Sequence, residues 1–402
     1  MLLVRNSVLI YIKQFINRIH YKLFNHKKQN YLNIVIYPLI DKEAELKILL
    51  DKINWYLPQK QQVFLHSTIK INGVTPPNNV IFVDKQDLIR LSKNMDSLIL
   101  LNNSWKLFSA LLILRWSNIK IIDPFFYSYM ESFNWQTLSF ELLLPSEKAE
   151  FKKKSAENFD KMHMRYQDKT KAYCHVTGPS FDNYPKYNFD PDAIQIICNS
   201  IVKNIDFLNY INKPDILCFA DAVFHFGTSE YARQFRKNVE EVVEKHQCFV
   251  ILPDTVLPIF YYNYPNLRPF LIGIESKYIG DFNFPRANEL WHLNTGNILS
   301  FLMIPIASSL VDEILIFGAD GRSKKETYFW KHSKTAQYST DLMESVFKAH
   351  PSFFRDRDYS DYYQNHCESL DGLILYGEAL AKSYYSISDS NIPTLKKRHV
   401  KS

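Results

Sequence analysis

Glycine is scarce in this chain, with ten residues in 402, and its distribution is uneven. Gly73 is the only glycine before Gly178, so nine of the ten lie from residue 178 onward. The first expected strand, at 32–37, is therefore not followed by the G-x-G-x-x-G turn of a dinucleotide-binding domain. Because tight turns and close backbone contacts favour glycine, we expect the binding site in the second half.

Cysteine is also sparse, with five residues and no C-x-x-C pair. This spacing argues against a zinc site, and the odd, dispersed set favours a reducing compartment. The sequence also lacks the G-x-x-x-x-G-K-[ST], H-E-x-x-H and G-x-S-x-G motifs. P-loop NTPases, zinc peptidases and α/β-hydrolases thus lose their usual support. No metal site is expected.

Long apolar runs and concentrated charge are missing as well. No run reaches the roughly 18 apolar residues of a spanning helix. The net charge of +6 is scattered, so nucleic acid is not an expected partner. Residues 5–28 instead form a basic amphipathic pattern, since the first acidic residue is Asp41. This expected helix either lies on an anionic membrane surface or docks on its own protein. We expect a cytoplasmic protein, with peripheral attachment to the inner membrane as one outcome.

The apolar pattern predicts two α/β domains. Strand-like and helix-like segments alternate over 31–145 and again over 172–388, which is typical of parallel sheets covered by helices. We expect two Rossmann-like domains joined by a charged helical connector at 146–171. A basic amphipathic N-terminal helix over 1–30 and a basic tail over 389–402 would flank them. The lysines of the connector are expected to form a solvated face.

Two strand ends in the second domain carry candidate ligand groups. An expected strand enters the turn Thr177-Gly178-Pro179-Ser180, which offers backbone N–H groups and hydroxyls for phosphate oxygens. Asn199 closes the expected strand at 193–199 and offers both a donor and an acceptor. Taken alone, the Gly-Pro-Ser segment is more typical of an ordinary turn, and a turn-forming Asn is common at a position such as 199.

Two more candidates follow in the chain. Asn294, Thr295 and Gly296 open a nearly apolar stretch at 295–310, which predicts a buried helix with Thr295 as its N-cap. Asp320 ends the expected strand at 313–321 between two glycines, where it would bind ligand hydroxyls or form an Asx turn.

The segment 350–372 concentrates titratable side chains. His366 is a candidate general base before an expected helix at 369–385. Asp356 and Asp358 imitate the D-x-D motif of metal-dependent glycosyltransferases, but one D-x-D in a charged segment is more typical of a salt-bridged surface loop.

In this order, VTGPSF, CN, NTG before an apolar helix, EILIFGAD and a final His resemble the bacterial sialyltransferases of glycosyltransferase family 42 and related DUF115-type proteins. The latter include motility-associated flagellin glycosyltransferases and an archaeal pterin pyrophosphokinase. The resemblance spans about residues 172–385. It implies a GT-A-variant, sialyltransferase-like parallel sheet with covering helices.

The resemblance also implies roles for individual residues. Thr177, Gly178, Pro179 and Ser180 would form the nucleotide phosphate loop, and Asn199 and Asp320 would contact the nucleotide. Asn294, Thr295 and Gly296 would meet the donor sugar and phosphate. Tyr328, matched by spacing, would stabilise the leaving phosphate, and His366 would deprotonate the acceptor. Thr177, Asn294 and Thr295 depart from the family pattern, which leaves the donor sugar open.

The expected function is transfer of sialic acid or a related acidic sugar from a CMP donor to a glycan or glycolipid acceptor, without a further cofactor. Phenols, hydroxyls and helix N-termini can stabilise a leaving phosphate, and His supplies a base near neutral pH. Two alternatives remain open. One is a Mg²⁺-dependent pyrophosphokinase acting on a pterin-like alcohol, with Asp320, Asp356 and Asp358 as ligands. The other is a non-catalytic protein that binds a nucleotide sugar or a glycan.

Overall fold

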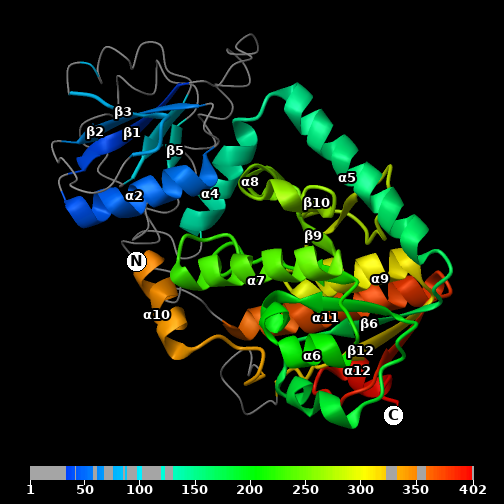
Figure 1. Ribbon diagram of the computed structural model, residues 1–402. Coiled ribbons are helices and arrows are strands. Elements are labelled where there is room, and N and C mark those ends of the chain that lie inside the picture. The colour runs from blue at the N-terminus through cyan, green and yellow to red at the C-terminus, as the bar shows by residue number, and fades with distance from the viewer. Residues whose placement is uncertain are drawn as a thin grey trace. The chain divides into compact units, whose positions relative to one another are not determined.

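The computed structural model describes residues 33–40, 42–57, 61–67, 76–84, 87, 97–101, 119–122, 130–322, 333–350 and 359–400. It contains two compact units, drawn in Figure 1. The first unit comprises Met1–Lys148 and Ala349–Arg355, and the second comprises Ala149–Lys348 and Asp356–Ser402. The boundary falls inside one continuous helix, α5 (Pro145–Tyr166), most of which belongs to the second unit.

The first unit is built on a five-stranded parallel sheet in the order β3-β2-β1-β4-β5. Apolar residues of the central strand, such as Ile34 and Ile36, are fully buried. The described elements are β1 (Asn33–Ile40), α2 (Glu43–Tyr56), β2 (Gln62–Ser67), β3 (Val80–Phe82), β4 (Ser97–Leu100), β5 (Ile119–Ile121) and α4 (Met130–Glu141). This confirms the alternating α/β pattern. The helix expected over 1–30 lies outside the described residues.

The second unit holds an eight-stranded parallel sheet in the order β11-β10-β9-β8-β7-β6-β12-β13. Its strands are β6 (Lys171–His175), β7 (Ile194–Cys198), β8 (Ile216–Cys218), β9 (Phe249–Pro253), β10 (Leu271–Lys277), β11 (Trp291–Leu293), β12 (Glu313–Phe317) and β13 (Ser383–Ser386). Successive strands run outward from β6 to β11, and the chain then returns to add β12 on the other side of β6. Both units are thus Rossmann-like α/β folds, and the strand order of the second reverses between β6 and β12.

Helices and short helical turns surround this sheet (Figure 1). They are η2 (Pro179–Lys186), η3 (Asn199–Lys203), α6 (Ile205–Tyr210), α7 (Glu230–His246), α8 (Leu257–Asn263), η4 (Pro265–Leu267), η5 (Leu299–Met303), α9 (Ile304–Leu310), α10 (Thr340–Ala349), α11 (Tyr359–Ala379) and α12 (Pro393–Lys397). The expected helix at 229–246 is confirmed as α7. Ser229 caps it by accepting a bond from Ala232 N at 3.2 Å.

Strand β11 pairs only with residues 275–277 of β10, so the earlier residues of β10 have no strand partner on that side among the described residues. Helix α5 covers this part of the edge. Asn158 Nδ2 donates to Leu271 O at 2.9 Å, and Ser155 Oγ accepts from Gly273 N at 3.0 Å. Two lysines of α5 pair with glutamates of the same helix, Lys153 with Glu157 at 3.8 Å and Lys154 with Glu150 at 3.4 Å. The segment expected to be a connector is therefore a packed part of the second unit with an ion-paired outer face.

Three expected boundaries differ in the structure. The stretch 295–310 becomes helical only from residue 298, and there Asn297 rather than Thr295 accepts a side-chain bond from Leu299 N at 3.0 Å. Helix α11 begins ten residues before the expected helix at 369–385 and ends before Ala381, whose φ is +61°. The expected tail includes α12, because Ile392 and Leu395 are buried.

Candidate functional site

The carboxyl ends of β6, β7 and β12 lie level with one another. His175 is the register partner of both Ile197 on β7 and Phe317 on β12. Beyond these pairs, Gly178 N donates to Gly318 O at 2.9 Å, which joins the two turns across the point where the strand order reverses. In open α/β sheets a ligand crevice forms at this point, so the turn at Gly178 has the expected placement.

The turn after β6 is closed by a carboxylate of the turn after β12. Ser180 N and Ser180 Oγ both donate to Asp320 Oδ2, at 3.1 and 3.0 Å. A Cβ at Gly178 would lie 2.1 Å from that oxygen, so only glycine allows this approach. Burial raises the pKa of Asp320 above its ordinary value. The sequence pattern predicts that both Ser180 and Asp320 contact the nucleotide, whereas the structure bonds them to each other.

The loop after β13 fixes the turn that carries Asp320. Ser388 Oγ accepts from Gly318 N at 3.0 Å, and Asn391 N donates to Asp320 O at 2.7 Å. Ser390 Oγ donates to Ala319 O at 2.6 Å. The backbone of this turn is therefore held by the loop after β13 on one side and by Gly178 on the other.

Asn199 follows β7 directly, in a left-handed conformation with φ of +49°. Its Oδ1 is buried and has no hydrogen-bond partner within the described part of the chain. The preceding residue, Cys198, contacts the end of β6, since its thiol lies 3.5 Å from His175 O. A buried acceptor without a donor is costly, so a ligand hydroxyl or amino group would be stabilised here.

Asn294, Thr295 and Gly296 form a turn whose side chains bond locally. Asn294 Oδ1 accepts from Gly296 N at 2.9 Å, and Thr295 Oγ1 lies 2.9 Å from Ser300 Oγ. Gly296 has φ of +73°, which favours glycine. The turn follows β11 and precedes η5, which packs on β7 and α11.

Helix α11 connects this turn to the one after β12. Tyr362 Oη donates to Gly296 O, and Tyr363 Oη accepts from Arg322 N at 3.2 Å. His366 lies on the same helical face and is 2% exposed. Burial lowers the pKa of His366 to about 4, so its imidazole is neutral at pH 7. The structure thus ties the helix of His366 to the turns of Gly296 and Asp320. Tyr328, Asp356 and Asp358 lie outside the described residues.

Asp182 is a residue of the site that sequence reasoning missed. It lies on η2 and accepts from Ser333 Oγ at 2.6 Å, Lys334 N at 2.9 Å and Thr335 Oγ1 at 2.7 Å. These bonds lower its pKa against the opposing effect of burial. Ser333 N also donates to Thr177 O at 2.8 Å. Asp182 therefore anchors the turn at 333–335 beside the turn after β6, a contact with no local sequence signal.

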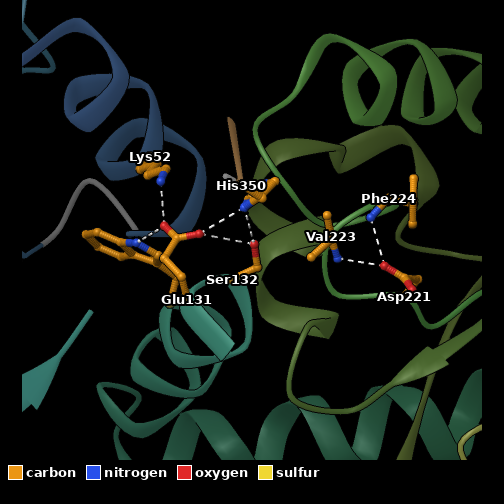
Figure 2. Close-up of polar contacts among 8 residues, drawn as sticks. Lys52, Glu131, Ser132, Asp221, Val223, Phe224 and His350 are labelled. Atoms are coloured by element: carbon orange, nitrogen blue, oxygen red, sulfur yellow. Dashed lines mark hydrogen bonds and ion pairs between the residues drawn. The ribbon is translucent and has the colours of Figure 1, made fainter. Parts of the chain in front are cut away.

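Further carboxylates follow the neighbouring strands. Asp221 Oδ1, after β8, accepts from Val223 N and Phe224 N at 2.8 Å each, as Figure 2 shows. This Asx-type bonding accounts for Asp221 structurally. Asp254 follows β9, and burial, with Glu275 adding to it, raises its pKa to about 7. Asp254 is thus a carboxyl group that titrates near neutral pH at the same edge of the sheet.

The first unit holds a separate buried polar cluster (Figure 2). Glu131 accepts from Lys52 Nζ at 2.5 Å and Trp135 Nε1 at 2.9 Å, and its other oxygen lies 2.9 Å from His350 Nδ1. Ser132 Oγ lies 3.0 Å from the same His350 nitrogen. In a Ser–His–acid triad the hydroxyl and the acid bond to opposite ring nitrogens. Here Ser132 and Glu131 both lie near Nδ1 of His350, so the cluster does not have the geometry of a triad. Because all its members are buried, we interpret it as a structural network.

Two broader features concern the described residues as a whole. No group of three or more His, Cys, Asp or Glu side chains is arranged to hold a metal ion there. Within the same ranges, no helix is long and apolar enough to cross a bilayer. All five cysteines are free thiols, and four of them are buried.

Comparison with known proteins adds little. No family model matches the chain, and no curated protein matches it. Among solved structures, one component of the dipicolinate synthase from Bacillus halodurans is similar over 56% of this chain and 82% of its own, at 12% identity and a TM-score of 0.17. At that TM-score the likeness supports no argument about this chain.

Proposed function

We propose that the second unit transfers a sugar from a nucleotide donor to a hydroxyl acceptor at the carboxyl edge of its sheet. The donor would be a CMP-linked sialic acid or related acidic sugar, and the acceptor a surface glycan or glycolipid. The fold would then be a GT-A-variant, sialyltransferase-like sheet. The observation that carries the proposal is the unsatisfied Asn199 Oδ1 at the end of β7, which pairs with β6 next to the point where the strand order reverses.

The donor would lie across the ends of β6, β7 and β12. Asn199 Oδ1 would accept a hydrogen bond from the nucleotide, and the turn at Thr177 to Ser180 would face its phosphate. Because the Asp320 carboxylate occupies both Ser180 donors, phosphate would bind there only after Asp320 turns away or is protonated. The raised pKa of Asp320 makes the protonation easier. Asn294, Thr295 and Gly296 would face the sugar.

The transfer would break the bond between the anomeric carbon and the phosphate oxygen of the donor. CMP would leave with the electron pair, and the acceptor oxygen would form the new bond to the anomeric carbon. His366 would take the acceptor proton. Its neutral form is the one that can accept a proton, and a donor phosphate nearby would raise its basicity.

The direct test uses purified full-length protein with CMP-sialic acid and a range of glycan acceptors. We expect CMP release by the wild type and its loss in His366→Ala and in Asn199→Ala. CMP binding, measured by calorimetry, should persist in His366→Ala and weaken in Asn199→Ala. Absence of CMP binding to the wild type would refute the proposal.

The same assay, repeated with ATP and a pterin-like alcohol, separates the two alternatives. Turnover of ATP that stops on addition of EDTA would indicate the pyrophosphokinase instead. Binding of CMP or a glycan without any turnover would indicate a binding protein. Attachment to an anionic membrane surface through residues 5–28 remains part of the proposal for a lipid-linked acceptor, and vesicle sedimentation tests it.

A further inference from the structure

Two successive tyrosines at the start of α11 bond to two different glycine turns. Tyr362 Oη donates to Gly296 O in the turn after β11. Tyr363 Oη accepts from Arg322 N at 3.2 Å and donates to Arg322 O at 3.3 Å, in the turn after β12. The Arg322 guanidinium also lies 4.8 Å from the centre of the Tyr363 ring. One helical end therefore connects two turns that are distant in sequence.

Both turns fit these tyrosines because each presents a glycine in a left-handed conformation. A Cβ at Gly296, where φ is +73°, would lie 3.4 Å from Tyr362 Cε2. A Cβ at Gly321, where φ is +67°, would lie 2.8 Å from Tyr363 Oη. At Gly321 only glycine combines this backbone conformation with so close an approach, whereas at Gly296 the positive φ alone favours glycine. The paired contacts are thus specific features of the two turns.

His366 follows Tyr362 by four residues and Tyr363 by three, so the three side chains share one face of α11. His366 is 2% exposed, and burial lowers its pKa to about 4. The charged and titratable groups that act on Tyr363 are Cys367 and Arg322. The burial of His366 depends on the first turns of α11 staying seated, because helix ends otherwise fray.

We propose that Tyr362 and Tyr363 are positioning residues, which seat the start of α11 on the Gly296 and Gly321 turns and thereby hold His366 in its buried place. This deepens the proposed function, on which the chemical role of His366 rests. The seating itself is a property of the free protein, and it can be measured without any substrate.

The test compares Tyr362→Phe, Tyr363→Phe and the double variant with wild type in the full-length protein. Each change removes hydroxyl bonds and keeps the ring, so folding should be retained. The readout is the pKa of His366, followed by NMR of histidine labelled at Cε1 and assigned with His366→Gln. We expect a pKa near 4 in wild type and a rise toward the ordinary 6.5 in the variants, by about one unit or more in the double variant.

Tyr376→Phe is the matched control, because Tyr376 lies on the same helix and packs on Phe284, with ring centres 5.2 Å apart. It should leave the pKa of His366 unchanged. An unchanged value in the double variant, or an equal shift in the control, would overturn the proposal. Hydrogen exchange at 294–298 and 320–322 gives a second measurement, since both turns should exchange faster in the double variant and neither in the control.

The outcomes for the two proposals are separable. A shifted His366 pKa in a protein that never binds CMP would support the positioning role and refute the transferase. CMP turnover with an unmoved His366 pKa in the double variant would do the reverse. If both hold, the single variants should lower kcat more than they raise KM, because positioning acts on the base rather than on donor binding.

Discussion

Ser180 and Asp320 are 140 residues apart in sequence, yet the backbone N–H and the hydroxyl of Ser180 both donate to one carboxylate oxygen of Asp320. Each group taken alone is a candidate phosphate ligand. Together they form a closed pair at the junction of the β6 and β12 turns. The bond explains why the turn needs Gly178, and it sets a condition on any anion that binds there.

Asp320→Ala should strengthen CMP binding under the proposed function. The change frees both Ser180 donors, and we expect about a tenfold gain in affinity, the effect of one charged hydrogen bond. In wild type the affinity should fall relative to the variant as pH rises, because deprotonated Asp320 holds the donors more tightly. Calorimetry at several pH values measures both effects. Asp389→Ala should not strengthen binding, because Asp389 raises the pKa of Asp320 without accepting from Ser180. Equal affinities of wild type and Asp320→Ala would contradict the expectation.

Gly178→Ala should destabilise the second unit. The added Cβ would lie 2.1 Å from Asp320 Oδ2 and 2.4 Å from Gly318 O, so the two turns must separate. Overpacking of this kind costs about 1–3 kcal/mol, measurable by urea unfolding. The double variant Gly178→Ala/Asp320→Ala should lose less than the sum of the single losses, because one of the two clashes is gone. Strict additivity would show that the carboxylate contact is unimportant.

The second unit should lose stability in mild acid. Burial lowers the pKa of His175, His225 and His292 to about 4 in each case, against an ordinary 6.5. The folded pKa is the lower one, so this contribution is fully present above about pH 6.5 and is lost as pH falls toward 4. Each group contributes about 1.4 kcal/mol per pH unit within that window. His292→Phe should reduce the slope of the unfolding free energy against pH by the contribution of one proton, about 1.4 kcal/mol per pH unit. A slope equal to that of wild type would contradict this.

Asp254 should act in the opposite direction. Burial, with a contribution from Glu275, raises its pKa to about 7 from an ordinary 3.8. The folded protein therefore holds the proton, and stability is lost as pH rises from about 4 to 7. Asp254→Asn keeps the neutral shape and should stabilise the protein at pH 8 but not below pH 4. Thermal unfolding at the two pH values measures this. A variant that gains nothing at pH 8 would show that the carboxyl group is ionised without penalty.

Glu131→Gln should strongly destabilise the first unit. The change leaves Lys52 buried without its carboxylate, and such a loss typically costs about 3–5 kcal/mol. Glu43→Gln is a matched control, because Glu43 pairs with Lys47 on the solvent side of the same helix as Lys52. It should change stability by less than about 1 kcal/mol. The pKa of Glu131 is lowered to about 2 from 4.5, so its contribution should vanish as pH falls through that range. Similar effects of the two changes would refute the network's role.

Local patterns predict most elements of the two sheets. Strands such as β7 and β9 are short apolar runs, and α7 carries both a helical apolar stripe and its Ser229 cap. The pattern is wrong where tertiary contacts set the boundary. It predicts helix at β13, because the pairing of that strand with β12, 70 residues away at Ser383 and Glu313, has no local signal. It also misses the start of α11, because the tyrosines there are held by distant turns.

The sequence by itself determined the α/β class, the parallel sheets and the set of polar residues at the strand ends, because hydrophobic period and turn residues are local properties. Only the tertiary structure decided what those residues contact. Ser180 binds Asp320, Asp182 holds the turn at 333–335, and Tyr362 and Tyr363 connect α11 to two glycine turns. These are contacts between strand ends brought together by sheet order, and sheet order arises from burial across the whole second unit rather than from any one stretch of chain.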